Sequence, residues 1–254
     1  MIESKIEALN KVFSDYLALS EKNIEKFISL NQDLLASFSL LLKNDKEENR
    51  KKSIGFNALY FFSIDEKKHS YIIAYLLTPN EGHGQGNLFL NLFLKKLGVS
   101  PEAEEDEWVV TAEKGRIDIM LRRDKPHSVI VVENKSNNAG DQPNQLYRYW
   151  YYMIFWPNRH EKNQVQYIKD HSNCYKIIYL VSDSGKDYSA DSVVKPNSLN
   201  SDKLSELPEK IDGIVKWSFS EHIVGWLEDS CEKLDNENHR LREFITQYLE
   251  YWKK

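Results

Sequence analysis

The N-terminal part of the chain carries apolar side chains at the spacing of an α-helix. No proline interrupts the series, which runs Ile6, Leu9, Phe13, Tyr16, Leu17, Ile24, Phe27, Ile28, Leu34, Leu35, Phe38, Leu41, Leu42. The spacing predicts one long helix or a helical hairpin, followed by a charged linker over residues 44–52. Such a stripe is usually a packing face, and a second copy of the protein could supply the partner surface. We interpret residues 1–52 as a helical extension, with dimerisation as a hypothesis.

The rest of the chain, residues 53–254, mixes short β-branched runs with helical segments. Strands are predicted over residues 108–113, 116–123, 128–135, 175–182 and 214–218. Helices are predicted over residues 65–77, 87–97, 145–150, 220–233 and 237–253. Residues 183–210, rich in Ser, Asp and Asn, are expected to form a surface connection that is partly helical near Leu204. The pattern is that of an α/β protein.

Two consecutive apolar runs, residues 116–123 and 128–135, are separated by four turn-forming residues. They are therefore predicted to form an antiparallel hairpin. If the loop closes the hairpin symmetrically, the numbers of two facing residues add up to 251, and Asp118 lies opposite Glu133. Because side chains alternate along a strand, Glu133 and Lys135 share one face of the sheet.

Two carboxylates that face each other across a sheet repel, and apolar neighbours keep out the water that would screen them. A divalent cation is the best candidate for the compensating charge. Lys135, on the same face, could polarise an attacking water. The alternative is that Asp118 and Glu133 are ordinary charges at strand ends, paired with Arg116 and Lys135.

Four motifs in this order make the pattern more specific: Glu66-x-x-His69-Ser70, His83-Gly84-Gln85-Gly86, Asp118…Glu133-x-Lys135 and Gln145-x-x-x-Tyr149. The series resembles the PD-(D/E)XK nuclease superfamily, and within it a bacterial branch. The Gln145 helix is similar to the one that RecB-type members place beside their metal. The resemblance runs from about residue 66 to the C-terminus, and Ile117 stands where the eponymous proline would be.

The resemblance implies a restriction-endonuclease-like core, which is a mixed β-sheet flanked by helices. It implies a nuclease that hydrolyses phosphodiester bonds with Mg²⁺ or Mn²⁺, in DNA or, less commonly, in RNA. The implied metal ligands are Asp118, Glu133, the backbone carbonyl of Asn134, and Glu66. Catalytic roles are implied for Asp118, Glu133, Lys135, Gln145, Tyr149 and Glu66.

The other predicted site residues could instead have purely structural roles. Glu66 also completes a capping box with Ser63 at the start of a predicted helix. His69, His83 and Arg116 are candidates for substrate contact, although a lone histidine is more often structural or exposed.

Net charge and composition exclude some classes of protein. The net charge of −5 excludes a chain wrapped in positive charge for non-specific nucleic-acid binding, but not a nuclease that uses acidic residues to hold cations. No apolar run approaches the roughly 18 residues of a membrane span, and the N-terminus lacks a signal-peptide core, so we expect a cytoplasmic protein without membrane partners. Cys174 and Cys231 form neither a disulfide framework nor a zinc pattern.

Two other functions stay open from the sequence. The chain could keep the nuclease fold as an inactive module for nucleic-acid binding or regulation. It could instead be a helical interaction protein that acts through residues 1–50. The complete set of matched site residues favours the enzyme, while restriction, phage defence and repair would all use the same chemistry.

Overall fold

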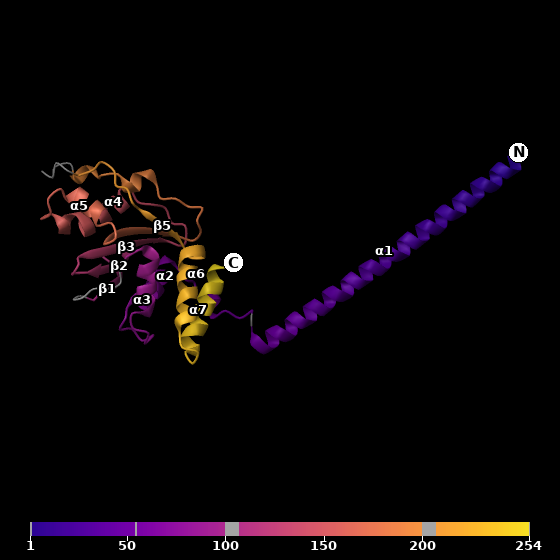
Figure 1. Ribbon diagram of the computed structural model, residues 1–254, viewed down its shortest axis with the longest axis horizontal. Helices are drawn as coiled ribbons and strands as arrows, with labels where there is room; N and C mark the ends of the chain where they lie inside the picture. Colours follow the sequence, from indigo (N-terminus) through magenta and orange to yellow (C-terminus); the bar gives the residue numbers. More distant parts are fainter. Residues whose placement is uncertain (1, 54, 100–106, 200–206, 254) are drawn as a thin grey trace. The chain divides into compact units, whose positions relative to one another are not determined.

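The computed structural model describes residues 2–53, 55–99, 107–199 and 207–253. It consists of two compact units, residues 1–57 and 58–254, and each is described by itself (Figure 1). No helix in the described part of the chain combines the length and the apolar character needed to cross a bilayer.

The first unit is a single helix, α1 (Ile2–Lys52). The helix does not fold back as a hairpin, and it continues through residues 44–52, so the predicted linker is wrong. The reason is local, because Lys, Glu and Arg favour helix and neither Pro nor Gly occurs before Gly55. Near the helix end, Lys52 pairs with Glu48 one turn earlier at 3.3 Å.

The second unit contains a five-stranded mixed sheet, as predicted. Its strands are β1 (Val109–Lys114), β2 (Ile117–Arg123), β3 (Ser128–Lys135), β4 (Tyr175–Val181) and β5 (Val215–Ser218). They lie side by side in chain order, with β1, β2 and β3 antiparallel and with β3, β4 and β5 parallel. The apolar strand β3 lies at the centre and is buried along its whole length.

The predicted register of the hairpin is confirmed. Ile119 pairs with Val132, and Arg123 pairs with Ser128, so the residue numbers add up to 251. This ladder ends at Ile119, whereas β3 continues beside β4 as far as Lys135. Strands β2 and β3 therefore separate at the position where Asp118 and Glu133 face each other.

Helices cover both faces of the sheet (Figure 1). One face carries α2 (Glu66–Leu77), α3 (Leu88–Leu97), α6 (Val224–Lys233) and α7 (His239–Trp252). The other carries α4 (Gln145–Tyr149), the π-helical η2 (Trp150–Phe155) and α5 (Gln164–Asp170). Shorter helical segments are η1 (Ala58–Phe61), η3 (Trp156–Asn158), η4 (Ala190–Val193), η5 (Asn197–Leu199) and η6 (Phe219–Ile223).

Two local predictions need correction or qualification. Helix α2 is capped by Asp65, whose carboxylate accepts the Lys68 N–H at 2.9 Å, so the capping box with Ser63 does not form. The carboxylate of Glu66 is therefore not used as a helix cap. Helix α5 was not predicted from the sequence, and the helical turn predicted near Leu204 lies outside the described residues.

Candidate functional site

The candidate site lies where β2 and β3 separate, on the sheet face covered by α4. On this face Met120 of β2 and Val131 of β3 pack into the apolar cluster beneath α4 and η2. Since side chains alternate along a strand, Asp118, Glu133 and Lys135 point to the same face. The two acidic groups are thus not on opposite sides of the sheet, and the predicted juxtaposition is present.

Asp118 occupies the gap between the strands. Its Oδ2 accepts the backbone N–H of Asn134 at 2.6 Å, so the carboxylate replaces a ladder hydrogen bond. The Asn134 side chain points to the opposite face, where its Nδ2 donates to the Glu66 carbonyl at 2.7 Å and to Ser70 Oγ at 3.0 Å. Helix α2 is tied in this way to the strand that carries Glu133.

Glu133 is only 3% exposed, and its carboxylate receives three polar groups. Lys135 Nζ lies 2.7 Å from Oε1, Gln145 Nε2 lies 2.8 Å from Oε1, and Tyr149 Oη lies 2.8 Å from Oε2. Gln145 and Tyr149 are one helical turn apart on α4, which explains why both reach the same acid. The structure therefore brings together five sequence-predicted residues, since Asp118 faces this cluster.

The charges in this cluster are not balanced. Burial raises the pKa of Asp118 to about 7, and the charges of Glu133 and Glu113 add to the effect, against the Asn134 N–H and Lys135. Burial also raises the pKa of Glu133, although Lys135 and Tyr149 oppose the shift. For Lys135, burial disfavours the charged amine, yet the neighbouring carboxylates hold its pKa above the ordinary value. One ammonium thus serves a buried carboxylate, that of Glu133, and a half-buried one, that of Asp118.

This donor set fits a hard divalent cation. Carboxylate oxygens in a site with more negative than positive charge are suitable ligands for Mg²⁺, which also binds backbone carbonyls and waters. Within the described ranges there is no cluster of three or more Asp, Glu, His or Cys side chains arranged to hold a metal. Ligands beyond Asp118 and Glu133 would therefore be the backbone carbonyl predicted at Asn134, waters or substrate oxygens.

Glu66, the fourth predicted ligand, lies at the start of α2. Its Oε1 accepts the backbone N–H of Asn137 at 3.1 Å, in the turn that follows β3. The side chain therefore reaches the segment next to Lys135, and its role as a ligand stays a prediction.

The two histidines predicted to contact substrate, His69 and His83, are both buried and contact other parts of the protein. His69 has no exposed surface, and its Nδ1 lies 2.7 Å from Tyr248 Oη. Burial lowers the pKa of His69 to about 4, against the charge of Asp65. A side chain without exposed surface cannot meet a substrate in this structure, so His69 is a core residue rather than a binding residue.

His83 organises its own loop. Its Nδ1 accepts the Gln85 N–H at 3.0 Å, so the proton lies on Nε2, which donates to the Thr78 carbonyl at 2.9 Å. Among the described residues, His83 contacts its own loop, Tyr75 and Phe89 rather than the Glu133 cluster, so we assign it to the loop.

A cavity of about 390 Å³ adjoins the cluster and is lined in part by Arg116, Gln145 and Tyr149. Two further lining residues, Arg148 and Tyr152, were missed by the sequence analysis. Helical spacing could have identified them, because each lies three residues after a predicted site residue, Gln145 or Tyr149.

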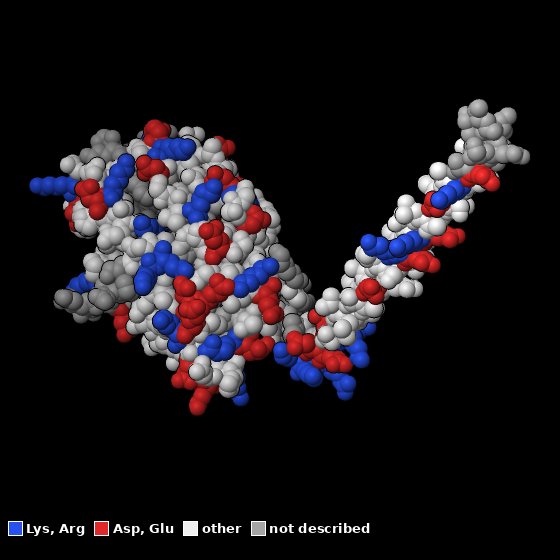
Figure 2. Space-filling view, turned by 45° about the vertical axis from the view of Figure 1, so that its right-hand side comes forward, with Lys and Arg blue, Asp and Glu red and all other residues white. Residues whose placement is uncertain are grey.

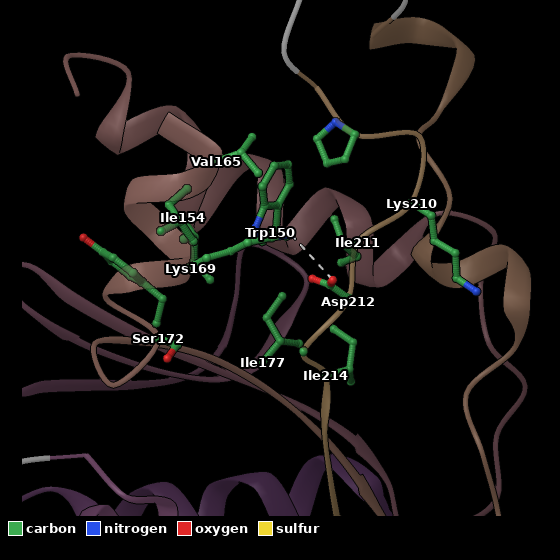
Figure 3. A pocket seen from close by; sticks show the side chains of 14 residues that line it. Trp150, Ile154, Val165, Lys169, Ser172, Ile177, Lys210, Ile211, Asp212 and Ile214 are labelled. Atoms are coloured by element: carbon green, nitrogen blue, oxygen red, sulfur yellow. Dashed lines mark ion pairs between the residues drawn. The ribbon is translucent and has the colours of Figure 1, made fainter. Parts of the chain in front are cut away.

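A second cavity, of about 140 Å³, is lined mainly by apolar residues of η2, α5 and the segment before β5 (Figure 3). Its polar groups include Lys169 and Asp212, which pair with each other at 3.7 Å. None of its lining residues belongs to the Glu133 cluster, so we do not include it in the site.

One face of the second unit carries charges of both signs. Figure 2 shows Lys and Arg intermixed with Asp and Glu on the visible face of the second unit. This face therefore offers no extended basic surface to a polyanionic substrate.

Comparison with known proteins is consistent with this geometry. A family model described as the PD-(D/E)XK nuclease superfamily matches residues 56–250, which include every element of the site. Searches of curated proteins and of solved structures gave no significant match. Because the matched region covers most of the sequence, the chain belongs to the PD-(D/E)XK nuclease superfamily.

Proposed function

We propose that the protein is a metal-dependent nuclease that hydrolyses phosphodiester bonds in DNA. The observation that carries this proposal is the buried Glu133 carboxylate, which receives Lys135, Gln145 and Tyr149 while facing Asp118 across the gap between β2 and β3. Members of the superfamily use divalent ions, and the unbalanced charge of this site suits one.

Asp118, Glu133 and the Asn134 carbonyl would hold Mg²⁺ or Mn²⁺, with Glu66 as a further ligand. When bound, the ion supplies activation of water at neutral pH and neutralises charge on the phosphoryl oxygens. Gln145 donates to Glu133 Oε1, and the single hydroxyl proton of Tyr149 lies between Glu133 Oε2 and the Arg116 carbonyl. Together these contacts restrict the orientation of the Glu133 carboxylate. Lys135, held beside Glu133, positions the attacking water and stabilises the negative charge that develops in the transition state.

The test is cleavage of plasmid DNA and of labelled DNA and RNA oligonucleotides, with Mg²⁺, with Mn²⁺ and with EDTA. We expect DNA hydrolysis that needs the divalent ion and stops with EDTA. DNA binding without hydrolysis under all conditions would contradict the proposal and would favour the inactive binding module.

We also propose that α1 associates with α1 of a second copy. From Phe13 onward a heptad seam can be traced along the helix, with apolar residues at seven of its nine positions: Phe13, Leu17, Ser20, Ile24, Phe27, Asn31, Leu34, Phe38, Leu41. The apolar residues of the seam are exposed, as is Leu9 nearby at 72%. A helix that exposes a continuous apolar seam gains stability by packing against a like seam, and a polar residue such as Asn31 can fix the register.

Full-length protein is expected to be a dimer at micromolar concentration by light scattering. Phe27→Glu places a charge within the seam and should give a monomer, whereas Lys22→Glu, outside the seam, should leave the dimer intact. A monomeric parent protein, or a dimer that persists in Phe27→Glu, would contradict association through α1.

A further inference from the structure

The turn between β1 and β2 holds Arg116 in a conformation that its backbone disfavours. Lys114 pairs with Ile117, so Gly115 and Arg116 alone make the turn, each with φ of +66°. A two-residue turn of this kind suits Gly or Asn, and an arginine adds the steric cost of a left-handed backbone. The turn itself therefore does not require an arginine.

The turn lies beside the Glu133 cluster and places Arg116 at the adjoining cavity. The Arg116 carbonyl lies 2.7 Å from the Tyr149 hydroxyl, which also contacts Glu133. The turn is thus attached to the cluster that we propose performs hydrolysis, and Arg116 lines the adjoining cavity of about 390 Å³. A non-glycine residue with a left-handed backbone beside the Glu133 cluster is a candidate for a functional role.

The cavity combines positive charge with an aromatic surface. Arg148 lines it together with Arg116, and in the described part of the chain neither guanidinium pairs with a carboxylate. Arg148 instead contacts neutral oxygens, at 2.9 Å from the Pro143 carbonyl and 3.4 Å from Gln142 Oε1. Tyr152, from η2, lines the same cavity and is 52% exposed.

A nucleotide carries the two features that such a cavity can bind. Its phosphate suits two arginines that are not neutralised, and its base can stack on a tyrosine ring. The cavity volume lies in the range of small-molecule sites. In a duplex, each base is covered by its neighbours, so only an unpaired nucleotide can present a face to Tyr152.

We propose that this cavity binds an unpaired nucleotide next to the scissile phosphate, so that the protein acts on single-stranded DNA or on single-stranded segments of a duplex. This inference rests on the proposed nuclease function, which it makes more specific. Arg116 and Arg148 hold the phosphate, and Tyr152 holds the base.

Arg116→Gly tests the phosphate contact without disturbing the fold. Glycine suits φ of +66°, and the backbone carbonyl that meets Tyr149 is kept, so we expect an unchanged or higher melting temperature. Binding of a labelled single strand in EDTA, followed by fluorescence anisotropy, should weaken about tenfold or more. The slope of log Kd against log salt concentration should fall by about 0.7, as expected for one lost phosphate contact. Arg122→Ala, which removes a charge at the other end of β2, is the matched control.

Tyr152→Leu tests the base contact and Tyr152→Phe is its control. Loss of the ring should weaken single-strand binding by roughly 5-fold to 100-fold without changing the salt slope, because no charge is removed. The phenylalanine variant keeps the stacking surface and should bind like the parent protein.

Binding and cleavage separate this inference from the proposed function. The inference is supported if the parent protein prefers the single strand to the matched duplex and if Arg116→Gly and Tyr152→Leu bind the single strand more weakly. This holds even if no hydrolysis is detected. Ion-dependent cleavage with a duplex preference, or with unchanged binding in both variants, would overturn the inference and leave the nuclease function standing.

Discussion

Asp118→Asn is expected to reduce ion-dependent cleavage by at least about 10³-fold and, at the same time, to stabilise the folded protein. The loss of cleavage follows from removing one of two carboxylates that would hold the cation. The gain in stability follows from the raised pKa of Asp118, since the ionised carboxylate is disfavoured by burial and by Glu133. An asparagine can still accept the Asn134 N–H through its side-chain oxygen.

The pH dependence gives this prediction a definite sign. The pKa of Asp118 rises from 3.8 to about 7 on folding, so the folded protein keeps a proton that the unfolded chain has lost. The parent protein without added metal should therefore lose stability as the pH rises from about 4 through about 7. This part of the loss, on the order of 2 kcal/mol for a site that is not fully buried, should be absent in Asp118→Asn.

Urea unfolding in EDTA between pH 4 and pH 8 measures this difference, and cleavage in Mg²⁺ measures activity. Asp124→Asn, at the exposed loop of the same hairpin, should behave like the parent in both assays. If Asp118 were an ordinary structural charge, its removal would lower stability and leave cleavage intact, which is the opposite result.

The second large effect is expected at Lys135. The side chains of Lys135 and Glu133 are 7% and 3% exposed and lie 2.7 Å apart. Lys135→Ala leaves a buried carboxylate without its cation, which should lower the free energy of unfolding by about 3–5 kcal/mol in the absence of metal. Cleavage should be lost as well, because the amine that positions the water is removed.

A double variant separates the two roles of Lys135. Glu133→Gln combined with Lys135→Met removes both charges of the pair, so most of the lost stability should return. Activity should not return, because a ligand and the amine are both missing. Chemical unfolding and oligonucleotide cleavage of the two variants provide the comparison. If Lys135→Ala were as stable as the parent protein, the structural role of the ion pair would be contradicted. If the double variant cleaved DNA, the catalytic role of the two residues would be contradicted.

The sequence was sufficient to predict the centre of this site. The register of β2 and β3 follows from a short loop between two apolar runs, and strand alternation then places Asp118, Glu133 and Lys135 on one face. Gln145 and Tyr149 follow from helical spacing. These features depend on short-range geometry, which the order of residues determines.

Contacts between distant segments could not be predicted in the same way. His69 matched a motif of the family, yet it is buried against Tyr248, which lies 179 residues further along the chain. The Asn134 side chain likewise meets Ser70 across 64 residues. Burial and hydrogen bonding of this kind depend on how helices pack on the sheet, and no local pattern specifies that packing.

Helix boundaries were predicted with mixed success. The charged residues 44–52 resembled a linker because they lack apolar periodicity, although lysine and glutamate are good helix formers. At α2 the cap was predicted at Ser63, whereas the helix is capped by Asp65. Polarity alone does not distinguish an exposed helix from a loop.

The central claim, that Asp118 and Glu133 together bind a divalent cation, can be tested most directly by anomalous diffraction from crystals grown with Mn²⁺. We expect an anomalous peak between the carboxylates of residues 118 and 133, on the sheet face shared with Lys135. A peak at another place, or no peak at this site while the Lys135–Glu133 ion pair stays intact at saturating Mn²⁺, would contradict it.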